Sequence, residues 1–125
     1  MDIISTRINT DLESIKNFNK EVIDLSKKRY ADEDLIFKLR LILDELIINS
    51  YKHGNKKVFD RKIDCLVLLD KSYLFVKIKD EGCGIACDKQ RNPYGESGRG
   101  IMLVDALCDK LIVYENSIAA LVFNK

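Results

Sequence analysis

The chain of 125 residues has room for one hydrophobic core, so we expect a single domain spanning residues 1–125. Apolar residues make up 46% of the chain and charged residues 33%, which is the balance of a soluble globular protein. Lysine and arginine almost balance the acidic residues, and the net charge of +1 gives no electrostatic reason to expect nucleic acid or an anionic membrane as a partner.

Targeting and redox signals are few. A helix that spans a bilayer needs roughly 20 apolar residues, and Lys38, Arg40 and Asp44 interrupt the most apolar stretch. The first residues lack the layout of a signal peptide, so we expect a cytoplasmic protein. Only one C-x3-C pair occurs and the chain has a single histidine, which predicts reduced, buried thiols rather than a disulfide or zinc framework.

The first part of the chain predicts a strand and two helices. Residues 2–9 alternate loosely, which is typical of a strand. Thr10 followed by Glu13 has the form of a capping box and predicts a helix that runs to about Lys28. A second helix is expected from about Asp32 to about Lys52. The apolar stripes that define these two helices are Leu12, Ile15, Phe18, Val22 and Leu25 in the first, and Leu35, Leu39, Ile42, Leu43 and Leu46 in the second.

The rest of the chain predicts two hairpins separated by a loop and a short helix. Residues 63–69 and 74–78 alternate with a period of two and predict an antiparallel hairpin. Residues 80–100 are too polar for core and too long for a tight connection. Ile101, Val104 and Leu107 mark one side of a short helix, and residues 110–114 and 118–123 predict a closing hairpin. The order of elements predicts an α+β class: a two-layer sandwich of a mixed, mostly antiparallel sheet with the helices on one face.

Glu45 and Asn49 form the first candidate site. They are four residues apart and so lie on one line of the second predicted helix, between Leu41 and Ile48 on one side and apolar core residues on the other. Polar side chains among apolar ones are costly to bury without partners, so this line is expected to border a cavity. The alternative is a polar pair at the edge of the core, satisfied by water or backbone groups.

Two glycine-rich segments form the other candidates. Asp80 to Gly84 follows a predicted strand, where alternate glycines let the backbone approach a ligand and a carboxylate can accept a hydrogen bond from an exocyclic amine. Gly95 to Gly100 precedes a predicted helix, whose free N–H groups and dipole suit phosphate oxygens. It is neither a P-loop nor a dinucleotide fingerprint. Alone, each segment also fits an ordinary glycine turn or a helix cap.

Together the three motifs resemble the N, G1 and G2 boxes of the Bergerat-fold (GHKL) ATPase superfamily. The matching residues are Glu45, Asn49, His53 and Gly54, then Asp80, Gly82 and Gly84, then Ser97, Gly98, Arg99 and Gly100. Residues 43–54 and 79–85 are most similar to the anti-sigma-factor serine/threonine kinases of that superfamily. Such proteins phosphorylate a small anti-anti-sigma protein, and many hold a sigma factor inactive as homodimers.

The resemblance implies a role for each residue. Glu45 is the general base and Asn49 the Mg²⁺ ligand, while Asp80 binds the adenine amino group of ATP. The remaining nucleotide-binding residues implied are His53, Gly82, Gly84, Ile85, Ser97, Gly98, Arg99, Gly100 and Ile101. His53 is not expected to be a phosphoacceptor, because the chain lacks the helical hairpin that would present one. Relatives commonly carry a threonine near the adenine, where this chain has Ala119 or Ala120.

Two other functions remain open at the level of sequence. One is a nucleotide-gated anti-sigma binding module that transfers no phosphate, against which the presence of Glu45 argues. The other is a switch kinase that acts on a stressosome-like scaffold. The sequence does not identify the protein substrate or any sigma factor.

Overall fold

The computed structural model describes residues 1–82 and 99–125. The predictions made for Cys83, Gly84, Ile85, Cys87, Ser97 and Gly98 lie outside these residues. In chain order the elements are β1 (Asp2–Asn9), α1 (Leu12–Arg29), α2 (Glu33–Asn49), a π-helical turn η1 (Ser50–Gly54), β2 (Lys62–Leu69), β3 (Tyr73–Lys79), α3 (Arg99–Leu107), β4 (Lys110–Tyr114) and β5 (Ser117–Phe123).

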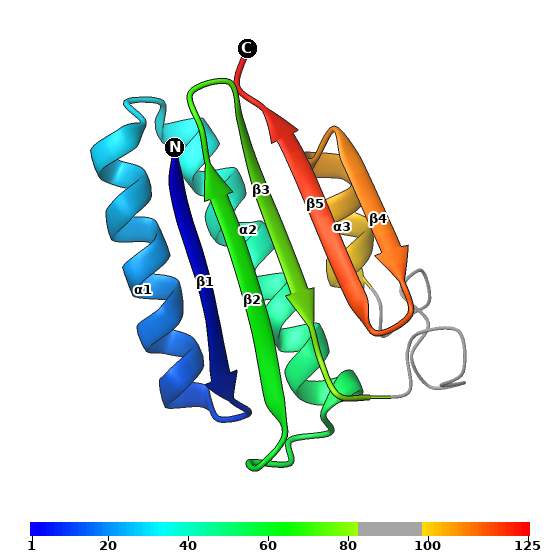
Figure 1. Ribbon diagram of the computed structural model, residues 1–125. Helices are drawn as coiled ribbons and strands as arrows, with labels where there is room; N and C mark the ends of the chain where they lie inside the picture. Colours follow the sequence, from blue (N-terminus) through cyan, green and yellow to red (C-terminus); the bar gives the residue numbers. More distant parts are fainter. Residues whose placement is uncertain (83–98) are drawn as a thin grey trace.

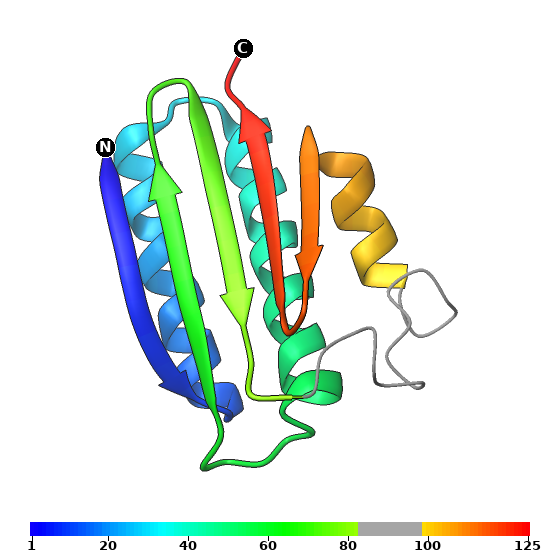
Figure 2. The same ribbon diagram turned by 45° about the vertical axis from the view of Figure 1, so that its right-hand side comes forward.

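The strands form one sheet in the order β1-β2-β3-β5-β4. Figures 1 and 2 show α1, α2 and α3 on the same side of it, so the predicted two-layer α+β sandwich is confirmed. The prediction of a mixed sheet is wrong for the described residues, because all four of their ladders are antiparallel. Each hairpin joins neighbouring antiparallel strands, and β5 returns beside β3 after α3 and β4.

The start of α1 differs from the prediction. Asp11, not Thr10, caps the helix, because its carboxylate accepts from the backbone N–H groups of Glu13 and Ser14 at 3.1 and 3.0 Å. Thr10 is instead buried, and its hydroxyl donates to the carbonyl of Arg61 at 2.7 Å. Leu12 is 58% exposed and does not belong to the core stripe, because it lies in the first turn, at the rim of the sheet.

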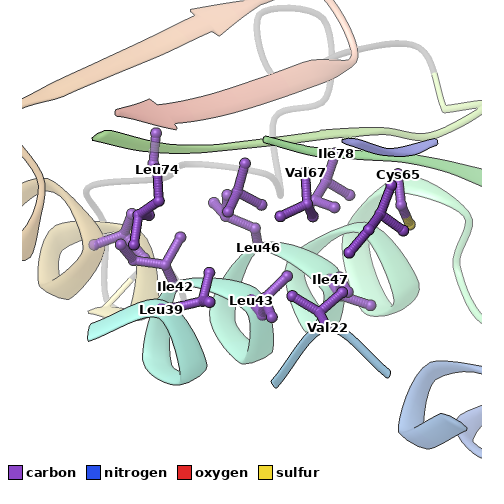
Figure 3. Packing of buried hydrophobic residues seen from close by; sticks show 14 of the residues in the cluster. Val22, Leu39, Ile42, Leu43, Leu46, Ile47, Cys65, Val67, Leu74 and Ile78 are labelled. Carbon is purple, nitrogen blue, oxygen red and sulfur yellow. The ribbon is translucent and has the colours of Figure 1, made fainter. Parts of the chain in front are cut away.

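The core lies between α2 and the sheet. Side chains from one face of α2 meet the inward residues of β2 and β3, as Figure 3 shows. The stripe predicted for α2 is buried in full, and the alternating residues of β2 and β3 face it. In α2, β2 and β3, the residues with no exposed surface are Leu39, Ile42, Leu43, Leu46, Ile47, Ile63, Val67, Leu69, Leu74 and Val76.

The end of α2 departs from the predicted regular helix. The α-helical pattern stops at Asn49 and continues as the π-helical turn η1 up to Gly54. Tyr51, in this turn, is half-buried and packs against the core. A π-turn widens the helix by one residue and is often found at functional sites. It shifts the side chains after Asn49 relative to those before it.

Other sequence predictions concern α3 and the cysteines. Arg99 and Gly100 belong to the first turn of α3 rather than to the loop before it, because the helix begins at Arg99. Cys65 is buried with a free thiol, and burial raises its pKa to about 12, so it stays protonated and unreactive at neutral pH. Within residues 1–82 and 99–125, no helix is long and apolar enough to cross a membrane.

Candidate functional site

The second helix brings Glu45 and Asn49 to the border of a small cavity, as their spacing predicts. Both side chains are half-buried, and the cavity has a volume of about 130 Å³. This is room for a metal ion with a few waters or for a phosphate group. The residues that line it are Glu45, Ile48, Asn49, Lys52, His53, Gly100 and Ile101.

Asn49 carries a buried polar atom that nothing in the described residues satisfies. Its Nδ2 atom has no hydrogen-bond partner among residues 1–82 and 99–125. Buried amide groups are nearly always paired, and an unpaired one costs about 1 to 3 kcal/mol. Asn49 also lines the cavity, so its side chain lies beside the space that a ligand would occupy.

The carboxylate of Glu45 lies directly against the first turn of α3. A Cβ atom added at Gly100 would overlap the Oε2 atom of Glu45, so only glycine leaves space for the carboxylate at this position. Ile101, the next residue, is 1% exposed and anchors the turn in the core. The packing of α3 against α2 therefore determines where the Glu45 carboxylate lies.

Asp80 follows β3 and is buried, with 2% of its surface exposed. Its Oδ1 atom accepts a hydrogen bond from the backbone N–H of Gly82 at 2.9 Å. A Cβ atom added at Gly54 would overlap the carboxylate of Asp80. Gly54 thus lets the end of η1 approach the carboxylate closely, which explains why the chain carries glycine there.

The predicted residues fall into two neighbouring groups rather than one pocket. Glu45, Asn49 and His53 share the cavity with Gly100 and Ile101. Asp80 and Gly82 do not line that cavity, and instead lie against Gly54 at the end of η1. His53 and Gly54 are adjacent, so the turn η1 joins the two groups.

Three residues near these groups escaped the sequence analysis. Lys52 is exposed and is a positively charged residue among those that line the cavity. Asn55 is fully buried, and its side chain forms hydrogen bonds with three separate segments. The carbonyl of Asn116 accepts from the backbone N–H of Asp80, and its side-chain amide donates to the carbonyl of Asp80. Lys52 was open to prediction, since it lies three residues after Asn49. Nothing in the sequence pairs either asparagine with the segment after β3.

Of the predicted nucleotide-binding set, Gly84, Ile85, Ser97 and Gly98 lie outside the described residues. Arg99 opens α3. Of the two alanines, Ala120 alternates with Ile118 and Val122 and is buried in the core on the helix-covered side of the sheet, while Ala119 lies on the opposite face.

A metal ion bound at this cavity would have few protein ligands. No group of three or more histidine, cysteine or acidic side chains capable of holding a metal occurs in the described part of the chain. Mg²⁺ is typically held by one or two protein ligands together with water and substrate phosphates, rather than by an all-protein cage. Asn49 at the cavity wall fits that kind of site.

A match to a known protein family identifies the family of this chain. The family described as the histidine kinase-like ATPase domain matches residues 8–123. The chain belongs to this family. Membership of the histidine kinase-like ATPase domain family supports the binding of ATP, and it agrees with the observed antiparallel sheet covered by helices on one face. Among curated proteins, no relative matches the chain.

Proposed function

We propose that this histidine kinase-like ATPase domain is an ATP- and Mg²⁺-dependent serine/threonine protein kinase of anti-sigma-factor type. Its substrate would be a small, STAS-like anti-anti-sigma protein. The observation that carries the proposal is the shared cavity of Glu45 and Asn49, in which a carboxylate and an unpaired buried amide lie together with Lys52.

The residues of the cavity suit phosphoryl transfer. The side-chain oxygen of Asn49 would hold Mg²⁺, which when bound neutralises phosphate charge. Lys52 would lie against the phosphate oxygens and add a second positive charge. The cavity volume of about 130 Å³ matches the terminal phosphate group and its ion, while the rest of the nucleotide would extend towards Gly54 and Asp80.

Glu45 would act as the general base. Its carboxylate would take the proton of the substrate hydroxyl while the hydroxyl oxygen forms a bond to the γ-phosphorus. The bond from that phosphorus to the oxygen bridging the β- and γ-phosphates breaks, and ADP leaves with the electron pair. A domain that only binds nucleotide has no need of a carboxylate at this position, so Glu45 favours an enzyme over a binding module.

Asp80 would recognise the adenine ring. A buried carboxylate oxygen can accept a hydrogen bond from the exocyclic amino group of adenine, which guanine lacks at that ring position. The bond from the N–H of Gly82 to Oδ1 keeps the carboxylate oriented. The phosphates of ATP would thus be bound near the start of η1, and the adenine ring near its end.

The acceptor would come from a partner protein. His53 is a wall residue of the cavity, on the same helical segment as the proposed metal ligand, which argues against its being the phosphorylated group. Glu45 lines the cavity and is only half-buried, which suits a serine or threonine hydroxyl presented by a partner. We also propose homodimers and the sequestering of a sigma factor, on the resemblance of the motifs alone.

The test begins by identifying the partner. Affinity capture from native lysate, with ADP and with ATP, would be followed by mass spectrometry and by transfer of label from γ-labelled ATP to each captured protein. We expect label on a serine or threonine of a small protein. Glu45→Gln should bind Mg-ATP like the wild type and lower the transfer rate by about 100-fold or more.

Two results would contradict the proposal. One is a wild-type protein that binds Mg-ATP and captures partners but labels none of them, which would make the domain a nucleotide-gated binding module. The other is a Glu45→Gln variant with undiminished transfer. Gln is nearly isosteric with Glu and retains the packing against Gly100, so a loss of transfer could not be attributed to misfolding.

A further inference from the structure

Asn55, the residue after Gly54, connects four segments of the chain from a fully buried position. Its Nδ2 atom donates to the hydroxyl of Thr10 at 2.8 Å and to the carbonyl of Lys62 at 2.9 Å. Its Oδ1 atom accepts from the backbone N–H of Glu81 at 2.7 Å. Its own backbone N–H donates to the carbonyl of Ser50 at 2.7 Å, which closes the turn η1.

These partners admit only an amide at position 55. The carbonyl of Lys62 can only accept, and the hydroxyl of Thr10 already donates to Arg61, so both require donors from residue 55. The N–H of Glu81 requires an acceptor. An aspartate would lack the donors, and an apolar residue would lack both functions. The orientation of the amide is therefore determined by its neighbours.

Asn116 holds the same stretch of backbone from the other side. It lies in the turn between β4 and β5, next to Glu115, whose φ of 52° belongs to the left-handed region. The backbone N–H of Asp80 donates to the carbonyl of Asn116 at 3.0 Å, and the Nδ2 atom of Asn116 donates to the carbonyl of Asp80. The ladder between β3 and β5 is thus extended by one residue past Lys79.

The two asparagines therefore hold the backbone on both sides of the Asp80 side chain. Asn116 bonds the N–H and the carbonyl of Asp80, and Asn55 bonds the N–H of the next residue, Glu81. Asn55 is also the residue that follows Gly54, against which the Asp80 carboxylate lies. Any shift of either asparagine would move the carboxylate relative to η1.

We propose that Asn55 and Asn116 are positioning residues that hold the Asp80 carboxylate where it selects adenine, with Asn55 linking that carboxylate to the helix that carries Glu45 and Asn49. The inference rests on the proposed function, because it takes Asp80 to be the acceptor for the adenine amino group. It adds that adenine selectivity depends on two side chains that do not themselves touch the nucleotide.

The test compares ADP with inosine diphosphate, which carries a carbonyl in place of the exocyclic amine. Calorimetry would give the ratio of their dissociation constants for the wild type, Asn55→Ala and Asn116→Ala. We expect each variant to bind ADP about tenfold more weakly, the order of one lost hydrogen bond to a charged group. Binding of inosine diphosphate should change little, so the ADP preference should fall by the same factor.

Thr10→Val is the matched control. It removes the hydroxyl at the far side of Asn55 and two hydrogen bonds, but leaves the bond from Glu81 to Asn55 in place. We expect it to lower the melting temperature and to keep the wild-type ADP preference. A purely structural role for the network would instead lower stability in all three variants and leave the ADP preference of all three unchanged.

Other results would overturn the positioning role of the two asparagines. Wild-type selectivity in a folded Asn55→Ala or Asn116→Ala variant would overturn the inference, as would an equal loss of selectivity in Thr10→Val. If Asn55→Ala does not fold, Asn116→Ala, at a half-buried position in a hairpin turn, decides alone. A wild-type protein that binds neither nucleotide would overturn the proposed function itself, and that result is distinguishable because it is seen before any variant is made.

Discussion

The two faces of α2 differ in burial and polarity. Leu39, Leu43 and Leu46 have no exposed surface and belong to the hydrophobic core. Glu45 and Asn49, from the same helix, are half-buried beside a cavity, and Asn49 has a buried nitrogen without a partner in the described chain. One face therefore stabilises the fold, and the other carries a polar atom that the described residues leave unpaired.

The difference suggests that stability and binding can be changed separately on one helix. Truncating a core side chain lowers the free energy of unfolding, because it leaves a cavity in the core. Replacing a site residue that has an unpaired buried atom should change the free energy of unfolding little in the absence of ligand. Substitutions on the two faces should therefore have opposite signatures.

The largest effect is expected on the core face. Leu46→Ala should lower the free energy of unfolding by about 2 to 5 kcal/mol, because it removes a fully buried side chain. Urea unfolding measures it, with Leu103→Ala on the exposed side of α3 as the control. A loss of less than about 1 kcal/mol, typical of a surface position, would break the comparison.

The second effect concerns Tyr30, where the core extends to the start of α2. Tyr30 is 6% exposed, its hydroxyl donates to the carbonyl of Asp70 at 2.7 Å, and burial raises its pKa to about 12. The unfolded chain releases this proton near pH 10 and the folded chain only near pH 12. The stabilisation is thus complete below pH 10 and falls by about 2 to 3 kcal/mol as the pH rises to 12.

The measurement for Tyr30 is urea unfolding between pH 8 and about pH 11.5, below the raised pKa. Tyr30→Phe should be less stable at pH 8, by about 1 kcal/mol for the lost hydrogen bond, but should show a smaller decline above pH 10. Tyr114→Phe, at a side chain that is 68% exposed, should decline like the wild type. Parallel declines in all three proteins would contradict the assignment.

The third effect is on the site face and should leave stability almost intact. Gly100→Ala places a methyl group where the carboxylate of Glu45 lies, and Glu45 can rotate away at little cost. The substitution also favours the helix by about 1 kcal/mol. We expect phosphoryl transfer to fall about tenfold or more because the base is displaced.

A double-mutant cycle sharpens this prediction. If Gly100→Ala acts by displacing Glu45, adding it to Glu45→Gln should cause no further loss of transfer. Independent, multiplying losses would show that Gly100 serves another purpose. Transfer rates of the four proteins, measured at saturating Mg-ATP, provide the answer.

The smallest effect has the opposite sign to the first. Asn49→Ala should leave the ligand-free protein as stable as the wild type or more stable by about 1 kcal/mol, because alanine favours the helix and removes an unpaired buried amide. Asn17→Ala, on the exposed side of α1, should gain only the helix propensity. A clear destabilisation by Asn49→Ala would mean that the amide is satisfied within the protein.

The fold was predictable where a local pattern determines it. The stripe of α2 and the alternation in β2 and β3 were confirmed because burial on one face imposes a period of 3.6 or 2. Errors arose at the ends of elements. Thr10 resembles a helix cap but forms tertiary hydrogen bonds, and Asp11 caps the helix instead. Competing uses of a hydroxyl group leave no trace in spacing.

The candidate site was predictable only in part. Glu45 and Asn49 share a helix face, and their common cavity follows from their spacing of four residues. The bond between Asn55 and Glu81 joins positions 26 apart, and that between Asn116 and Asp80 joins positions 36 apart. Such pairs depend on strand register and on the path of η1, which periodicity does not specify.

The most direct test of the account is titration calorimetry of the wild-type protein and Asn49→Ala with Mg-ATP. The account predicts saturable heat at one site for the wild type, a raised melting temperature in the presence of ligand, and a loss of the Mg²⁺ dependence in Asn49→Ala. No heat and no thermal protection in a folded wild-type protein would contradict the claim that the cavity between α2 and α3 holds the metal-bound phosphates of ATP.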